Sequence, residues 1–177
     1  LGSLLLSTDK GKTKLATFLD ERSMHSLYEK FILEYFRYHH PEYKANPDTI
    51  QWNIDDGMID FLPSMVTDIT LKFAGKVLII DAKYYGRTLQ KQFDKYTLHS
   101  NNVYQIFTYV KNQDKNNTGD VAGILLYAKT EDITPDVMFN MGGNQIGAKT
   151  LDLNKEFSLI VAQLDKIAED YFGKQAI

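Results

Sequence analysis

The chain has 177 residues, which is enough for one hydrophobic core and too few for two domains of ordinary size. Its residues are 44% hydrophobic, 12% aromatic and 24% charged, a composition that excludes disordered, collagen-like and membrane-spanning proteins. The net charge of -3 gives no indication of a nucleic-acid partner. Cysteine is absent, so only carboxylates and four histidines are available as metal-binding side chains.

The N-terminal end of the sequence bears on where the protein works. Its apolar cluster, residues 4–6, is too short for a signal peptide or a membrane span, so we expect a cytoplasmic protein with no membrane partner. The sequence starts with Leu1 rather than Met, within an apolar segment. We therefore expect residues 1–177 to be a single domain from the C-terminal part of a longer chain.

Hydrophobic periodicity predicts helices and strands in succession. Apolar residues at helical spacing indicate a long first helix that ends before Pro41, because the residue before a proline disfavours helical geometry. Ala74 and Gly75 separate two β-rich runs and predict a tight hairpin. In chain order the predicted elements are helix 15–40, strand 49–54, strands 65–73 and 76–84, helix 102–111, strand 121–128, strands 137–141 and 145–153, and a last helix capped by Asn154.

This order of elements predicts an α/β fold with a mixed central sheet flanked by helices. The run 121–128 is almost entirely apolar, as in a strand that is covered on both faces. The polar loop 112–119 is expected to be the most mobile segment. Four residues of helix 102–111 are expected to face the core: Val103, Ile106, Phe107 and Val110.

The predicted hairpin also brings charged residues together. If Ala74 and Gly75 form the turn, counting back one pair at a time places Asp68 opposite Asp81, with Cβ atoms about 4.5–5.5 Å apart. Lys83 projects from the same face, two residues after Asp81. Two carboxylates this close repel each other unless a cation lies between them. A divalent metal site and an ordinary salt bridge from Lys83 to either aspartate both satisfy this pattern.

Several motifs resemble those of one nuclease superfamily. Residues 63–68, followed after twelve residues by Asp81-Ala-Lys83, resemble the relaxed motif of the PD-(D/E)xK nucleases, although Pro63 stands five residues before the acid rather than adjacent to it. Gln105-Ile-Phe-Thr-Tyr109 resembles the QxxxY motif of their RecB-like branch. The McrC nuclease subunit of McrBC-type modified-cytosine restriction systems is similar over three segments in particular: residues 24–31, 39–42 and 81–85.

This resemblance implies a restriction-endonuclease-like fold and a Mg²⁺ site that Mn²⁺ can also fill. Asp68, Asp81 and the Ala82 carbonyl would bind the metal, and Glu29 would bind it through water. His25, one helical turn before Glu29, matches a histidine of RecB-like nucleases and is a further candidate ligand. Mg²⁺ suits these residues on independent grounds, because it prefers a few carboxylates and keeps several waters.

The remaining matched residues would act on DNA. By resemblance, Lys83 completes the catalytic set with the three acids, and it stabilises the attacking hydroxide or the charge of the phosphorane. Gln105 and Tyr109 are four residues apart, so they share one helical face and would contact the DNA backbone. Tyr85, in register with Lys83 along the strand, is a candidate phosphate contact.

The function implied by the resemblance is Mg²⁺-dependent cleavage of DNA by the nuclease subunit of a modification-dependent restriction complex. No GxxxxGK[ST] string occurs in the sequence, so nucleotide hydrolysis would come from another chain. By resemblance, that partner is a McrB-like AAA+ GTPase. The alternative is a catalytically silent module that keeps the nuclease fold and scaffolds a nucleoprotein assembly.

Overall fold

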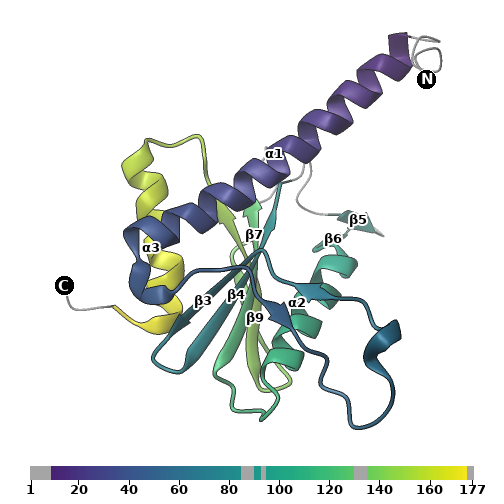
Figure 1. Ribbon diagram of the computed structural model, residues 1–177. Coiled ribbons are helices and arrows are strands. Elements are labelled where there is room, and N and C mark those ends of the chain that lie inside the picture. Colours follow the sequence, from purple (N-terminus) through teal and green to yellow (C-terminus); the bar gives the residue numbers. More distant parts are fainter. Residues whose placement is uncertain (1–8, 85–89, 93–94, 130–134, 175–177) are drawn as a thin grey trace.

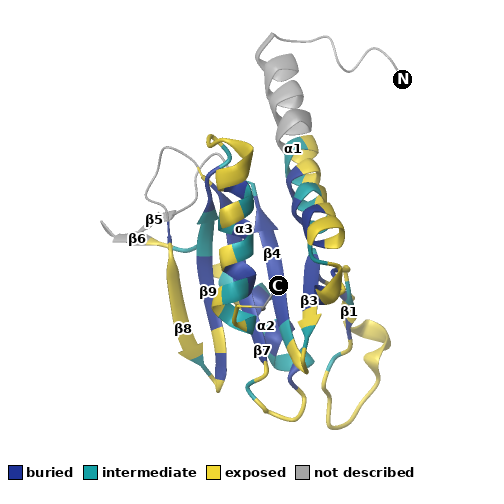
Figure 2. Cartoon of the chain, turned by 90° about the vertical axis from the view of Figure 1, so that its left-hand side faces the viewer, coloured by how far each residue is buried: buried dark blue, intermediate teal, exposed yellow. Residues whose placement is uncertain are grey.

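The computed structural model describes residues 9–84, 90–92, 95–129 and 135–174 (Figure 1). They form an α/β fold around a mixed five-stranded sheet in the order β3-β4-β7-β9-β8. Helices α1 (Asp9–His39) and α3 (Phe157–Phe172) cover one face of this sheet, and α2 (Ser100–Gln113) covers the other (Figure 2). The predicted fold class is therefore confirmed.

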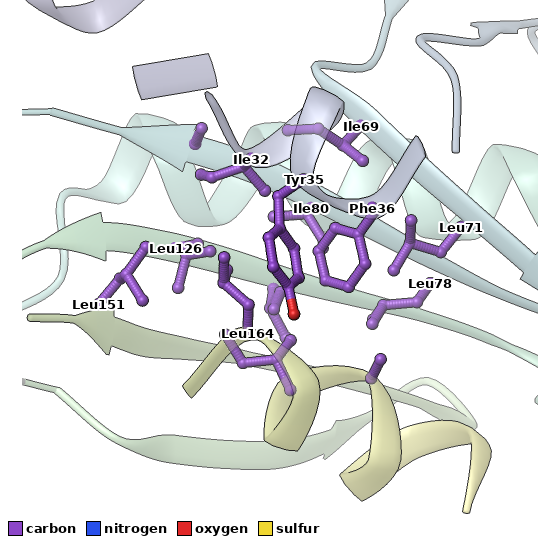
Figure 3. Close-up of a cluster of buried hydrophobic side chains, with 14 of the residues drawn as sticks. Ile32, Tyr35, Phe36, Ile69, Leu71, Leu78, Ile80, Leu126, Leu151 and Leu164 are labelled. Atoms are coloured by element: carbon purple, nitrogen blue, oxygen red, sulfur yellow. The ribbon is translucent and has the colours of Figure 1, made fainter. Parts of the chain in front are cut away.

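Helix α1 ends where the sequence predicted. Ile32, Tyr35 and Phe36 recur at helical spacing and are buried against the sheet (Figure 3). The last helical residue is His39, and a 3₁₀ turn over Pro41–Tyr43 follows. Although α1 has 31 residues, neither it nor any other helix in the described part of the chain is apolar and long enough to cross a membrane.

Strands β3 (Ile69–Phe73) and β4 (Lys76–Lys83) form the predicted antiparallel hairpin. At its turn, Ala74 and Gly75 have φ values of +48° and +82°. Positive φ at both central residues is the geometry of a type I′ turn, whose twist matches that of the two strands. The predicted register is confirmed by the pairs Phe73 with Lys76 and Ile69 with Ile80.

The predicted strand 49–54 is shorter than expected, and the predicted first strand of the hairpin, 65–73, is divided into two. Strand character over 49–54 is limited to β1 (Thr49–Ile50), which pairs with a separate short strand, β2 (Met65–Val66). At Thr67 the chain passes from β2 toward β3: the Thr67 N–H donates to the Asp48 carbonyl at 2.9 Å, and the Thr67 hydroxyl accepts the Asp48 N–H at 2.8 Å. The chain therefore leaves one strand and enters another just ahead of the hairpin.

The central strand of the sheet is β7 (Val121–Ala128). All eight of its residues are buried, as predicted, and it runs parallel to β4 on one side and to β9 (Asn144–Leu151) on the other. The predicted second hairpin is confirmed by β8 (Val137–Met141), which pairs antiparallel with β9 and forms the exposed edge of the sheet. A further two-stranded sheet, which the sequence did not predict, joins β5 (Gln90–Gln92) to β6 (Lys95–Thr97).

Helix α2 packs closely on β7 at Gly123. A Cβ atom added there would lie 2.6 Å from Val110 and 2.7 Å from Ile106, and both of these helical residues are fully buried. Phe107, predicted to face the core, is 38% exposed, and Tyr109 is buried in its place. The prediction was wrong for Phe107 and is confirmed for Ile106 and Val110, which are buried, and for Val103, which packs against the same cluster.

The start of α3 also differs from the prediction. Asn154 does not cap the helix but lies in the turn before it, where its N–H donates to the Asp152 carboxylate at 3.0 Å. Glu156 occupies the N-cap position, without a capping hydrogen bond from its side chain, and the helix begins at Phe157. Gly173, with a φ of +86°, ends the helix as predicted.

The loop 112–119, expected to be mobile, is tied to the sheet by Asp114. One carboxylate oxygen accepts the N–H and the hydroxyl of Thr118, both at 2.9 Å, and the other accepts the Gly119 N–H at 2.9 Å and the Asn144 amide at 2.7 Å. Burial acts to raise the pKa of Asp114, but these hydrogen bonds outweigh it and lower the pKa to about 2. The hydrogen bonds of Asp114 thus hold the loop 112–119 to the start of β9.

Candidate functional site

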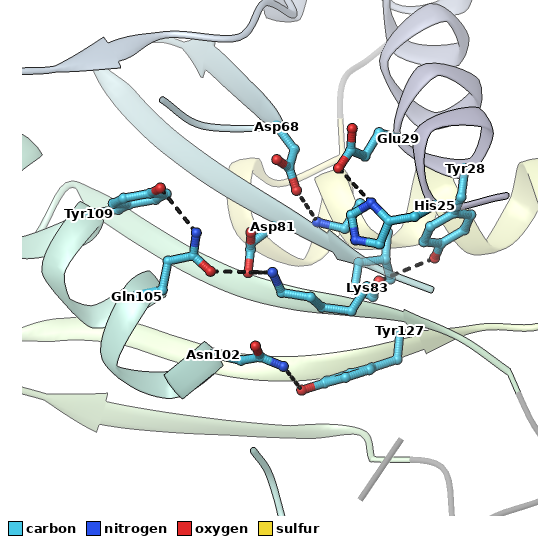
Figure 4. Close-up of polar contacts among 12 residues, drawn as sticks. His25, Tyr28, Glu29, Asp68, Asp81, Lys83, Asn102, Gln105, Tyr109 and Tyr127 are labelled. Atoms are coloured by element: carbon cyan, nitrogen blue, oxygen red, sulfur yellow. Dashed lines mark hydrogen bonds and ion pairs between the residues drawn. The ribbon is translucent and has the colours of Figure 1, made fainter. Parts of the chain in front are cut away.

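Two charged residues of β4, Asp81 and Lys83, lie at its carboxyl end, between the sheet and α2 (Figure 4). Side chains alternate along the strand, so Ala82 packs into the core beneath α1 while Asp81 and Lys83 point toward α2. Both charged residues are buried, with 2% and 7% of their surface exposed. Buried charges are rare unless they are paired, so the contacts of this pair identify what the site can hold.

Asp81 is the more buried of the two charged groups. Lys83 Nζ lies 2.8 Å from Asp81 Oδ2 as an ion pair, but the angles are not those of a hydrogen bond, and among the described residues this oxygen has no hydrogen-bond donor. The pKa of Asp81 is raised to about 7, mainly by burial, which is opposed by the charge of Lys83 and reinforced by the nearby Asp68 carboxylate. Because burial disfavours its charged form, the Asp81 carboxyl group would ionise more readily if a cation other than Lys83 also lay beside it.

Asp68, the acid predicted to lie opposite Asp81, precedes β3 and reaches across to β4. Its Oδ2 atom accepts the N–H of Ala82 at 2.8 Å, which holds the carboxylate against the strand (Figure 4). The N–H and C=O of one residue in an extended strand point to the same side, so the Ala82 carbonyl faces the same edge as Asp68. The structure therefore brings both acids and this carbonyl together.

The ammonium group of Lys83 is connected to α2 through the QxxxY residues. It donates to Gln105 Oε1 at 3.3 Å, and Gln105 Nε2 donates to the Tyr109 hydroxyl at 3.1 Å. The spacing of four residues puts Gln105 and Tyr109 on one helical face, as predicted. Lys83 is held between an acid on its own strand and an amide on the facing helix.

Glu29 approaches the same site from α1. Its carboxylate lies 2.8 Å from Nδ1 of His25, one turn earlier, and both side chains are partly exposed. Burial raises the pKa of Glu29 and the Asp68 carboxylate adds to this effect, while His25 and Lys83 oppose it. These interactions put Glu29 within electrostatic reach of Asp68 and Lys83. His25 contacts Glu29 directly, which makes it a partner of that acid.

Two buried polar residues that the sequence analysis missed lie next to Lys83. Asn102 donates from its amide to the Tyr127 hydroxyl at 3.1 Å, and both residues are buried (Figure 4). Tyr127 is the register partner of Lys83 in the parallel β4 and β7 pair, so the two share one face of the sheet. Asn102 stands one helical turn before Gln105, and this spacing could have indicated from the sequence that Asn102 shares the face of Gln105. No sequence pattern marks Tyr127, because it lies within an apolar buried strand.

The site can be tested for its fit to a metal ion. Among the described residues, no three His, Asp or Glu side chains lie together in a way that could hold a metal by themselves. Asp68 and Asp81 would supply two carboxylates, so the Ala82 carbonyl and water would have to complete the shell. A buried oxygen without a donor, beside a second carboxylate, fits Mg²⁺, which keeps several of its waters. Tyr85, the candidate phosphate contact, lies outside the described residues.

Comparisons with known proteins identify the family of the chain. The family model described as "McrBC 5-methylcytosine restriction system component" matches residues 4–128. A relative in Escherichia coli (strain K12), the "Type IV methyl-directed restriction enzyme EcoKMcrBC", is 30% identical over 155 residues, which are 86% of this chain and 44% of the relative. The chain thus spans less than half the length of that relative. The family match covers well over half of the chain and includes both aspartates, the lysine and the QxxxY residues. The resemblance found in the sequence is confirmed, and the chain belongs to the family of McrBC 5-methylcytosine restriction system components.

Proposed function

We propose that this chain is a Mg²⁺-dependent endodeoxyribonuclease domain, which hydrolyses DNA as the cleavage subunit of a GTP-driven, modification-dependent restriction complex. The observation that carries the proposal is the burial of Asp81 beside Asp68 and Lys83 at the end of an inner strand. Stability alone does not explain this cluster, because a buried ion pair often stabilises a fold less than apolar side chains of the same size. Membership of a restriction family supports a role in DNA cleavage.

The metal-binding residues in this proposal are Asp68, Asp81 and the Ala82 carbonyl, with Glu29 holding one of the metal's waters. When bound, Mg²⁺ would supply an acidified water and polarise the phosphoryl oxygen. Mn²⁺ prefers the same oxygen ligands and would substitute for it. His25 contacts the Glu29 carboxylate at 2.8 Å and would hold it in place, and it stays a further candidate ligand of the metal.

Lys83 supplies the positive charge of the reaction. Its ammonium group is held by Asp81 at 2.8 Å and by Gln105 at 3.3 Å, so it needs no rearrangement when negative charge develops on the phosphoryl group. Gln105 and Tyr109 present one polar face of α2 beside this ammonium and would position the DNA backbone. Asn102 and Tyr127 lie behind them and support the same face.

A partner chain would provide the energy and the target recognition. The relative's name describes a methyl-directed restriction enzyme, which suggests that this chain acts on DNA selected by its methylation. No phosphate-binding GxxxxGK[ST] string is present in the sequence, so GTP hydrolysis would belong to a McrB-like AAA+ subunit. Cleavage by this chain would then depend on delivery of the DNA by that subunit.

Calorimetric titration with MnCl₂ and MgCl₂ tests the metal site directly. We expect saturable uptake by the native chain and at least a tenfold loss of affinity in Asp81→Asn, because one carboxylate ligand is removed. Asp136→Asn, at a residue that is 81% exposed on the sheet's far edge, is the matched control and should bind the metal normally. A chain that takes up neither metal would be the silent scaffold module instead.

Plasmid cleavage by the complex assembled with the GTPase subunit tests the activity. We expect Asp81→Asn to abolish cleavage while GTP hydrolysis by the partner continues, because the change affects only the nuclease site. Melting curves of the variant establish that the fold is retained. Cleavage at the normal rate by folded Asp81→Asn would contradict the proposed function.

A further inference from the structure

Asn102 and Tyr127 form a second polar link between α2 and the sheet, beside the link from Lys83 to Gln105. The Asn102 amide donates to the Tyr127 hydroxyl at 3.1 Å, and the two residues are 7% and 0% exposed. A buried hydrogen bond adds little net stability, but a buried polar group that loses its partner costs the full free energy of its desolvation. The pair therefore favours one arrangement of helix and sheet over others, which apolar contacts alone do not.

The two links are neighbours on both elements (Figure 4). On the sheet, Tyr127 of β7 is the register partner of Lys83 in β4, so the two side chains share one face at a strand spacing of about 4.8 Å. On α2, Asn102 and Gln105 are three residues apart, which is about 4.5 Å along the helix axis. Two bonds this close between the same elements fix both the position of the helix along its axis and its rotation about that axis.

The second link anchors the first turn of α2. The side chain of His99, at the N-cap position, gives the described helix no capping hydrogen bond. The close packing at Gly123 holds the middle of α2, farther along the helix. A first turn without a cap opens readily. The bond from Asn102 to Tyr127 therefore holds in place the turn that precedes Gln105.

Gln105 would be displaced if this anchor were lost. Its Oε1 atom accepts from Lys83 at 3.3 Å, which is long for a hydrogen bond, while its Nε2 atom donates to the Tyr109 hydroxyl at 3.1 Å. A small outward shift of the first turn would therefore break the contact with Lys83 first. The ion pair at 2.8 Å would then draw the ammonium group toward Asp81 and away from the helix.

We propose that Asn102 and Tyr127 are positioning residues, which act through Gln105 to hold the Lys83 ammonium group at its place in the site. Neither of the two touches the substrate. The link from Tyr127 to Gln105 rests on the geometry of α2 and β7, whereas its effect on cleavage rests on the proposed function, in which Lys83 supplies the positive charge. The two parts can be tested separately.

Nuclear magnetic resonance of the ¹⁵N-labelled full chain tests the geometry without any need for activity. Tyr127→Phe removes one hydroxyl group and keeps the buried ring. We expect it to shift the side-chain signals of Gln105 and Lys83, because Asn102 loses this acceptor and the first turn of α2 moves. Tyr43→Phe, at a tyrosine that is 2% exposed on the other face of the sheet, is the matched control and should leave both signals unchanged. Unchanged signals of Gln105 and Lys83 in folded Tyr127→Phe would overturn the proposal.

Plasmid cleavage by the complex assembled with the GTPase subunit tests the effect on the reaction. We expect Tyr127→Phe and Asn102→Ala each to lower the rate at saturating DNA by roughly tenfold, less than the approximately 10²-fold that a 1 Å misplacement can cost. Uptake of Mn²⁺ by both variants should be normal in calorimetry, because the proposed ligands Asp68 and Asp81 are untouched. Tyr43→Phe should cleave at the normal rate. Normal cleavage by both single variants at the link would overturn the proposal as well.

A double-mutant cycle tests whether the pair acts through Gln105. Added to Gln105→Ala, Tyr127→Phe should lower the rate by less than about twofold, because the residue that it positions is already gone. The same loss of rate in both backgrounds would mean that Tyr127 supports only the fold, and would overturn the proposal. If the signals of Gln105 and Lys83 shift as expected but the native complex does not cleave DNA, the proposed function fails while the link from Tyr127 to Gln105 stands.

Discussion

Lys83 and Asp81 form a contact that an ordinary salt bridge would also form, with nitrogen and oxygen 2.8 Å apart. Two features separate it from an ordinary pair. Both groups are buried, where desolvation offsets much of the Coulomb attraction, and a second carboxylate, Asp68, lies close enough to raise the pKa of Asp81. A lysine that served only the fold would meet one acid. This lysine lies beside an acidic pair and also bonds Gln105.

Lys83→Ala is therefore expected to affect chemistry more than folding. Loss of a preorganised charge typically costs on the order of 10²–10³ in rate. The cost in unfolding free energy should be about 1–2 kcal/mol, below that of a broken buried pair, because Asp81 with its pKa near 7 can take up a proton. The measurements are plasmid nicking by the assembled complex and urea unfolding of the chain.

Lys115→Ala, at an exposed lysine of the loop after α2, is the control for this experiment. It removes the same charge from the chain and should leave nicking and stability unchanged. If Lys83→Ala nicks DNA at the normal rate, the lysine has no catalytic role. If Lys83→Ala unfolds the chain, the ion pair is structural.

Asp114 determines a part of the pH dependence of stability. Its pKa is about 2 in the fold and about 3.9 in an unfolded chain, so the folded state favours the ionised form. The resulting stability is fully present above about pH 4 and is lost as the pH falls toward 2. Asp114→Asn should lower the unfolding free energy by about 1–3 kcal/mol near neutral pH, because the amide cannot accept all four hydrogen bonds.

The difference between native chain and Asp114→Asn should close as the pH falls from about 4 to 2. Urea unfolding at a series of pH values measures it. Asp120→Asn changes an exposed acid in the same loop and should show no such difference at any pH. A gap of constant size down to pH 2 would show that the stabilisation does not depend on ionisation of Asp114.

At the scale of elements, the hairpin turn can be tested because it sets the register of the acids. Ala74 has a φ of +48°, in a region that asparagine and glycine occupy more readily than alanine. Ala74→Asn should therefore stabilise the chain by up to about 1 kcal/mol. Gly75→Ala should destabilise it by about 1–2 kcal/mol, through strain alone, because an added Cβ at Gly75 meets no atom within 4 Å. Urea unfolding of both variants measures these changes, and a destabilised Ala74→Asn would contradict the type I′ assignment.

The elements that the sequence predicted well are those whose pattern admits one arrangement. The apolar run of β7 had to be a covered strand, and the turn at Ala74 and Gly75 permitted only one pairing of β3 with β4. The break at Thr67 was not predictable, because the hydrogen bonds made there join Thr67 to Asp48, nineteen residues earlier. The orientation of α2 was largely predicted, since Ile106 and Val110 pack at Gly123, but the burial of Tyr109 in place of Phe107 was not.

In the candidate site, contacts within one element or one hairpin were predicted, whereas most contacts between elements were not. Register placed Asp68 next to Asp81, and helical spacing placed Gln105 beside Tyr109, so local rules were sufficient for both pairs. The link from Lys83 to Gln105 joins two elements, and here the motif resemblance supplied what spacing could not. Asn102 and Tyr127 were missed because their contact depends on how α2 packs against β7, for which no motif exists.

At the scale of the whole molecule, the distribution of charge predicts weak DNA binding by the chain alone. The net charge is -3, and residues 45–71 next to the site carry no basic side chain. We expect dissociation constants for duplex DNA in the range of non-specific contacts, about 10⁻⁴–10⁻⁶ M, with loss of binding as salt is raised. Fluorescence anisotropy over a salt series measures this. Tight, sequence-specific binding that persists at raised salt would contradict it.

The place of Asp81 and Lys83 on an inner strand has a consequence for how the protein can be controlled. β4 is hydrogen-bonded to β3 on one side and to β7 on the other, and its last residues are buried. Backbone amides in such a strand exchange with solvent only when the sheet as a whole opens, unlike those of a loop. Asp81 and Lys83 are therefore expected to keep their positions while loops and chain ends open locally. If the proposed nuclease function holds, cleavage would be restrained by limiting the access of DNA rather than by unfolding of this strand.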